Sequence, residues 1–152
     1  MESSPFNRLE WQEVRDLSHC IVNATLVNDV VLQAALFQDL TVLLERLRER
    51  YGEHPILLET AADFCDDPSL QLDLYRRAIR LAEAHDLPTL TIRLSLASVL
   101  LQDFHDQTEA ARELMACESE VETAEDKIQE SEWCGLMRQC GEERKREHHE
   151  RH

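Results

Sequence analysis

Apolar residues recur every three or four positions along most of the chain, which is the spacing of one face of an α-helix. The pattern predicts a first helix over 8–26, whose apolar positions are Leu9, Val14, Leu17, Ile21 and Ala24. A second helix is expected between Asn28-Asp29 and Gly52, with apolar positions Phe37, Leu40, Leu44, Leu47 and Tyr51. No segment alternates apolar and polar residues as a half-buried strand does. The chain is therefore predicted to be all-α.

Residues that start or stop helices divide this pattern into hairpins. Ser4-Pro5, Asp67-Pro68 and Leu87-Pro88-Thr89 are typical of helix starts, because proline fits the first turn and Ser, Asp or Thr caps it. The pattern predicts about seven helices in one domain over 1–140. They form hairpins over 9–50, 55–86 and 89–121, followed by a helix over 124–140. The charged tail 141–152 is expected to be solvated or frayed.

Two of the hairpins share a pattern of small and large residues. Thr60-Ala61-x-x-Phe64 with Tyr75-x-x-Ala78 is followed 36 to 39 residues later by Leu96-Ala97-x-x-Leu100 with Ala110-x-x-x-Leu114-x-x-Cys117. A small side chain lets two helix backbones approach closely, and a large one fills the gap a turn away. The small residues Ala61, Ala78, Ala97 and Ala110 are therefore expected to be buried. Repetition at about 34–40 residues is typical of stacked helical hairpins.

These residues resemble the tetratricopeptide repeat, most clearly over residues 55–121, and the hairpin 9–50 would be a divergent repeat or a cap. The resemblance implies antiparallel hairpins stacked as a short right-handed superhelix, whose concave groove binds a peptide or a helix of another protein. By position, the groove residues would be Leu58, Glu59, Ala62, Cys65, Thr91, Leu94, Ser95, Ser98 and Gln102. The basic residues that bind peptide carboxylates in this family are missing there, although Arg93 is one position away. An irregular helical bundle is the alternative.

The formal net charge is −15, and acids concentrate in one segment. Eleven acids fall between Asp103 and Glu132, and within that segment only Arg112 and Lys127 oppose them. Nucleic-acid binding is not expected, because it depends on basic residues that neutralise phosphates. An acidic surface could attract a basic protein, or could only keep a helical surface soluble. The residues expected on that surface are Glu109, Glu113, Glu120, Glu122 and Glu125.

Other chemistry is sparse in the sequence. It contains no nucleophile elbow, phosphate-binding glycine loop or H-E-x-x-H motif, so we expect neither an enzyme nor a bound cofactor. His148 and His152 have the i, i+4 spacing of metal ligands, but they fall in the tail expected to fray, so no metal site is predicted. The five cysteines form no C-x-x-C pair, and Cys20 and Cys117 are expected to be buried thiols.

Two functions remain open from the sequence. One is a scaffold or adaptor that docks a peptide or helix of another protein. The other is a small acidic chaperone or inhibitor of a basic protein. With neither a signal peptide nor an apolar membrane segment in the pattern, the protein is expected to be cytoplasmic and not to bind a membrane.

Overall fold

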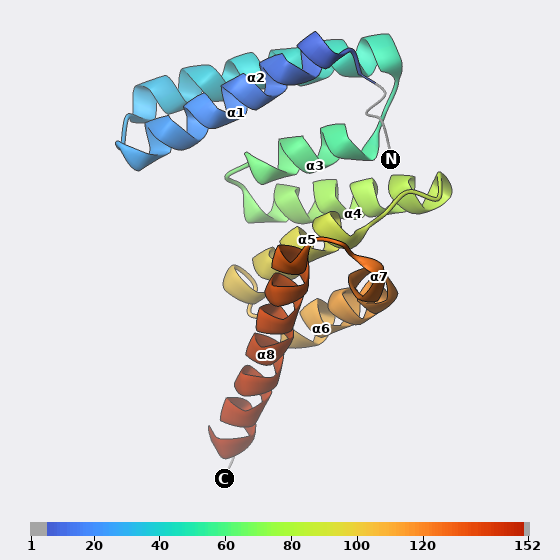
Figure 1. The fold of residues 1–152 in the computed structure, drawn as a ribbon. Helices are drawn as coiled ribbons and strands as arrows, with labels where there is room; N and C mark the ends of the chain where they lie inside the picture. Colours follow the sequence, from blue (N-terminus) through green and yellow to red (C-terminus); the bar gives the residue numbers. More distant parts are fainter. Residues whose placement is uncertain (1–5, 151–152) are drawn as a thin grey trace. The chain divides into compact units, whose positions relative to one another are not determined.

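The computed structural model describes residues 6–150, and their side chains through Gly141. These residues form eight α-helices and no strand, which confirms the all-α prediction (Figure 1). The helices are α1 (Arg8–Leu26), α2 (Val30–Tyr51), α3 (Pro55–Asp63), α4 (Pro68–Ala84), α5 (Leu90–Gln102), α6 (Gln107–Ala116), α7 (Glu118–Thr123) and α8 (Lys127–Glu150).

The contacts within the chain group it into two compact units, Met1–Leu57 and Leu58–His152. We call them unit 1 and unit 2 and describe each by itself. The single domain expected over 1–140 stays a prediction.

Unit 1 contains the antiparallel hairpin of α1 and α2, which lie side by side (Figure 1). The Asn7 and Asp29 side chains accept hydrogen bonds from the first-turn amides of α1 and α2, at 2.8 and 3.1 Å. Phe6 stacks on Trp11 and meets Tyr51 edge-on, so aromatic packing joins the start of α1 to the end of α2. The predicted cap at Ser4-Pro5 lies outside the described residues.

Unit 2 is built around α5. Eight of its 13 residues are buried, and α4, α6 and α8 all pack against it. A helix that is apolar on most sides is stable only when its neighbours cover it. The α8 helix is also attached to α6, because the indole Nε1 of Trp133 donates a hydrogen bond to the Leu114 carbonyl at 2.8 Å.

The small residues of the repeated pattern are buried in three of four cases. Ala78, Ala97 and Ala110 have no exposed surface, as predicted. The prediction is wrong for Ala61, which is half-buried, whereas its neighbour Ala62 is fully buried. Because Ala61 and Ala62 are adjacent, the sequence does not determine which of the two faces the core. In the structure Gln71 of α4 donates a hydrogen bond to the Ala62 carbonyl at 2.9 Å.

The C-terminal part differs from the predicted helices. The short helix α7 was not expected as a separate element; it follows a break at Cys117, whose carbonyl accepts from the Glu120 and Val121 amides. The last helix begins at Lys127 after an Asp126 cap and is helical to Glu150, well beyond the expected end at 140. The predicted fraying of 141–152 is thus not seen as far as Glu150. The sequence after Gly141 consists mainly of strong helix formers, without proline or glycine.

Replacing Ala97 with Leu tests the close packing around α5. The fully buried position has no room for three more carbon atoms, so we expect the free energy of unfolding to fall by about 1–3 kcal/mol. Ala116→Leu, at an exposed position of α6, is the matched control and should change it by less than about 0.5 kcal/mol. Equal thermal and denaturant stabilities of Ala97→Leu and the parent would contradict the packing described here.

Candidate functional site

Two carboxylates of α3 lie beside hydroxyl groups of α4 and α5. Glu59 and Asp63 are four residues apart and therefore share one face of α3. The Thr91 hydroxyl on α5 donates a hydrogen bond to the Glu59 carboxylate at 2.9 Å. The Tyr75 hydroxyl on α4 donates one to the Asp63 carboxylate. We call Glu59 and Asp63 the α3 acid pair.

Both acids of the pair are harder to ionise than ordinary carboxyl groups. Burial raises the pKa of Glu59, the negative charge of Asp63 raises it further, and the Thr91 hydrogen bond opposes the change. Burial likewise raises the pKa of Asp63, against the hydrogen bond from Tyr75. Glu59 is half-buried and Asp63 is exposed, and both carboxylates face hydroxyl groups, which stabilise a carboxylate less than a cation does.

The structure brings together some of the predicted groove residues. Glu59 and Thr91 are hydrogen-bonded to each other, and Ser95 lies next to the Tyr75 hydroxyl. The other predicted residues with accessible side chains are half-buried or exposed, namely Leu58, Cys65, Ser98 and Gln102. The sequence pattern did not indicate Asp63 or Tyr75 as part of this face. The only signal for Asp63 was its i, i+4 spacing from Glu59, and Tyr75 had appeared only as a large residue of the repeated pattern.

Two predicted groove residues are corrected by the structure. Ala62 is fully buried and Leu94 is 2% exposed, so neither side chain is available to a partner. The sequence pattern predicted that Ala61 faces inward and Ala62 faces the groove. In the structure the inward-facing alanine of α3 is Ala62, one residue later. Leu94 is buried because α4, α6 and α8 cover several sides of α5.

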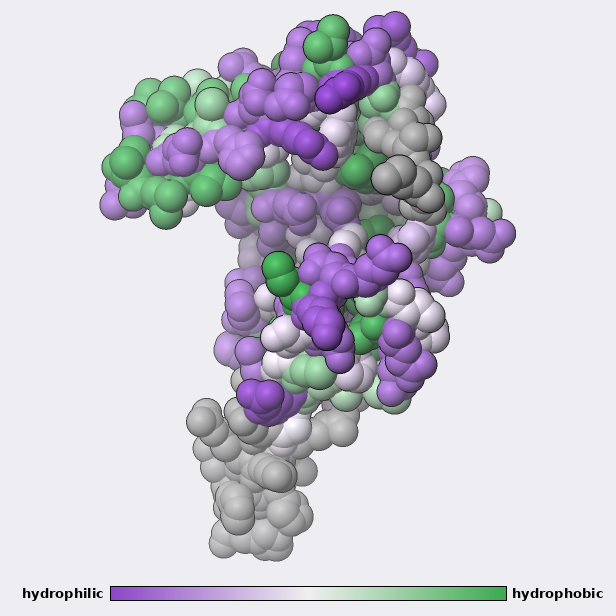
Figure 2. Space-filling view, in the orientation of Figure 1, coloured by the Kyte–Doolittle hydropathy of each residue, from purple (hydrophilic) through white to green (hydrophobic). Residues whose placement is uncertain are grey.

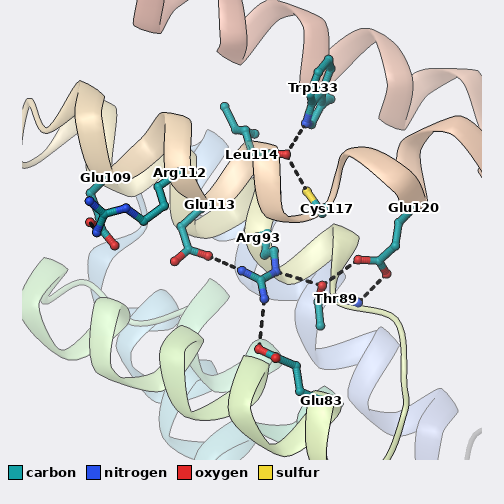
Figure 3. Close-up of polar contacts among 10 residues, drawn as sticks. All are labelled: Glu83, Thr89, Arg93, Glu109, Arg112, Glu113, Leu114, Cys117, Glu120 and Trp133. Carbon is teal, nitrogen blue, oxygen red and sulfur yellow. Dashed lines mark hydrogen bonds and ion pairs between the residues drawn. The ribbon is translucent and has the colours of Figure 1, made fainter.

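A second polar cluster centres on Arg93 of α5 (Figure 3). Its guanidinium contacts Glu113 of α6 at 2.7 Å and Glu83 of α4 at 3.0 Å, and its Nε donates to the Thr89 hydroxyl at 2.9 Å. The Arg93 and Glu113 side chains are only 12% and 15% exposed. The cluster therefore joins three helices by an ion pair that is largely removed from water.

Glu120 of α7 completes this cluster. Its carboxylate accepts hydrogen bonds from both the amide and the hydroxyl of Thr89, each at 2.7 Å (Figure 3). Thr89 is the N-cap of α5 but makes no capping hydrogen bond with its own side chain. A carboxylate near a helix N-terminus is also favoured by the helix dipole. Glu120 thus holds α7 against the start of α5.

These contacts correct the predicted acidic surface. Glu113 and Glu120 have structural partners, and Glu109 pairs with Arg112 at 2.9 Å. Only Glu122 and Glu125 of the five predicted acids are exposed, without a partner that the structure shows among residues 6–141. Counting the charges within the acidic segment did not reveal Arg93 as the partner of Glu113, because Arg93 lies outside that segment, 20 residues before Glu113.

The remaining candidate chemistry adds no site. Among residues 6–141, no group of three or more His, Cys, Asp or Glu side chains is arranged to hold a metal ion. His152 lies outside the described residues. Cys117 is buried as predicted, and burial raises its pKa to about 11, so it stays a thiol at neutral pH. The prediction is wrong for Cys20, which is exposed on α1. No described helix has the length and apolar character needed to cross a membrane.

Comparisons of the chain with protein-family models, curated proteins and solved structures found no match.

Removing the cation of one ion pair at a time tests whether the pair of Arg93 and Glu113 is removed from water. Arg93→Met leaves Glu113 and Glu83 without their cation, so we expect the free energy of unfolding to fall by about 2–4 kcal/mol. The exposed pair Arg112 and Glu109 is the control, and Arg112→Met should cost at most about 0.5 kcal/mol. Chemical denaturation measures both. Similar losses in the two variants would show that the Arg93 pair behaves as a surface pair.

The raised pKa of Glu59 predicts a pH-dependent stability. The folded chain binds this proton more tightly than the unfolded chain, so the stabilisation is greatest in acid and is lost as pH rises through the raised pKa. Glu59→Gln, which can still accept from Thr91, should therefore gain stability relative to the parent between about pH 4 and neutral pH. Thermal melts across that range give the difference. A difference in stability that does not change with pH would refute it.

Proposed function

We propose that the chain is a non-enzymatic protein-docking module, and that unit 2 binds a basic peptide or helix of another protein at the α3 acid pair. The observation that carries the proposal is the environment of Glu59 and Asp63. Glu59 is half-buried on α3, and charged groups that are partly buried are normally paired with an opposite charge. Within residues 6–141, no ion pair joins either carboxylate to a base. A Lys or Arg side chain of a partner supplies that charge.

The electrostatics favour a cation beside the half-buried Glu59 over one at an exposed acid. Two charges attract more strongly where water is partly excluded, and the desolvation cost of the carboxylates has already been met on folding. A bound cation also stabilises the ionised form of both acids. The affinity for a basic partner should therefore rise as pH increases through their raised pKa values.

The resemblance to tetratricopeptide repeats is consistent with the proposal. In tetratricopeptide repeats, the first helix of each hairpin carries the residues that line the binding groove. By position, Glu59 on α3 and Thr91 on α5 correspond to such residues. The burial of Ala78, Ala97 and Ala110 supports the same spacing of small residues. The right-handed superhelical stacking of the hairpins is part of this proposal.

A second candidate is an acidic chaperone or inhibitor of a basic protein. It is favoured by exposed acids around the turn between α7 and α8, which are Glu118, Glu122, Glu125 and Asp126. Such a surface acts by long-range attraction, so binding would weaken steeply as salt increases. Binding at the half-buried Glu59 of the α3 acid pair should depend less on salt.

Peptide selection on the full chain tests which acids bind. We expect a random peptide library to yield ligands enriched in Lys and Arg. The selected peptides should bind the double variant Glu59→Gln, Asp63→Asn at least about tenfold more weakly, because the paired charge is lost. The matched control Glu122→Gln, Glu125→Gln removes the same charge from exposed positions and should bind as the parent does.

Isothermal titration at low and moderate salt separates the two candidates. If binding weakens only in the control variant Glu122→Gln, Glu125→Gln, and falls steeply as salt increases, the result favours the acidic chaperone or inhibitor. Ligands without basic residues would contradict both candidates.

A further inference from the structure

Six large apolar side chains gather at the turn between α1 and α2 in unit 1. We call them the tip patch: Val22, Leu26, Val27, Val30, Val31 and Leu32. Each is between 46% and 83% exposed. Figure 2 shows hydrophobic surface concentrated at this end of the hairpin. Single exposed apolar residues are ordinary, but a contiguous group on a surface marks a contact with another molecule.

The turn itself does not need these side chains. Asn28 adopts a positive φ of 57°, which asparagine tolerates well, and the Asp29 amide donates to the Ala24 carbonyl at 2.9 Å. Asp29 then caps α2 through its side chain. Inside the hairpin, Ile21 and Ala24 are the buried residues of this part of α1. The tip patch is therefore additional to what the turn and the hairpin core use.

Charge distribution limits what can cover the patch. Asp29 is the only Asp, Glu, Lys or Arg among the 22 residues 17–38, although such residues make up 31% of the whole chain. A basic protein finds almost no opposite charge there. An anionic membrane surface is not attracted either, because peripheral binding uses Lys and Arg beside the apolar face. A second copy of this chain meets the least repulsion where its own charges are fewest.

The area of the patch fits an interface between two copies. A fully buried Val or Leu side chain removes about 60–120 Å² of apolar area from water. Six such side chains at their observed exposures provide on the order of 400 Å² of apolar area. A standard interface buries about 800 Å² on each partner, a little over half of it apolar. One tip patch therefore supplies about the apolar part of such an interface.

We infer that the tip patch is a self-association surface, on which a second copy of the chain docks through the same residues. A two-fold symmetric contact requires a surface that complements itself, and an uncharged apolar patch does so. From Val31, the tip patch continues along one face of α2 through the exposed residues Ala35 and Val42, which follow at helical spacing. The inference rests on unit 1 and is independent of the α3 acid pair.

Sedimentation velocity on the full chain tests this contact. We expect the mass to double as the concentration rises from about 1 to about 100 μM, a range that covers weak dimers. Val27→Glu with Val31→Glu should raise the dimer dissociation constant at least about tenfold, because it places four carboxylates in one interface. The control is Ile128→Glu on α8, which changes an equally exposed apolar residue outside the patch and should leave the constant unchanged.

Each alternative occupant gives a different result. A parent that stays monomeric to about 100 μM overturns the inference, whether or not it binds neutral phosphatidylcholine vesicles or another protein. Equal weakening by Ile128→Glu overturns it as well, since the effect would then be one of net charge. Circular dichroism checks that the variants are helical, and Val27→Ser with Val31→Ser gives the same test without added charge.

Discussion

The burial of α5 is the constraint on which unit 2 depends. Because α4, α6 and α8 pack against this helix, a polar side chain that is buried along it needs a partner. Arg93 contacts Glu113 and Glu83, and Thr89 is hydrogen-bonded by Glu120. On the side facing α3, Thr91 donates to Glu59. The acids of four helices are thus arranged around the polar side chains of one helix.

This arrangement divides the acids of a strongly acidic chain into different roles. Glu113 and Glu120 stabilise the packing of α6 and α7 against α5, so their charge is not available to a partner. Glu122 and Glu125 are exposed, so water solvates their charge in the free protein. Glu59 and Asp63 differ from both groups, since each has a raised pKa and is bonded to a hydroxyl rather than to a cation. That difference is why the proposed docking site lies on α3 and not in the acidic segment.

The sequence predicted the features that depend on neighbouring residues. Asp67 and Asp106 cap α4 and α6 as expected, and α1 has the predicted bounds 8–26. What could not be predicted depends on tertiary contacts. The choice between Ala61 and Ala62 follows from the packing of α3, and the pairing of Arg93 with Glu113 joins residues with no local spacing signal. For the candidate site, Glu59 and Thr91 were found by position, but Asp63 and Tyr75 were not.

The central claim is that both carboxyls of the α3 acid pair have raised pKa values and no cation of their own within the described part of the chain. Carbon-13 NMR of the side-chain carboxyl carbons, followed through a pH titration of the full chain, measures the ionisation of Glu59 and Asp63 individually. The account predicts pKa values above the ordinary range for both acids, and a decrease when a Lys- or Arg-containing ligand binds. Ordinary pKa values for both acids in the free protein would contradict it.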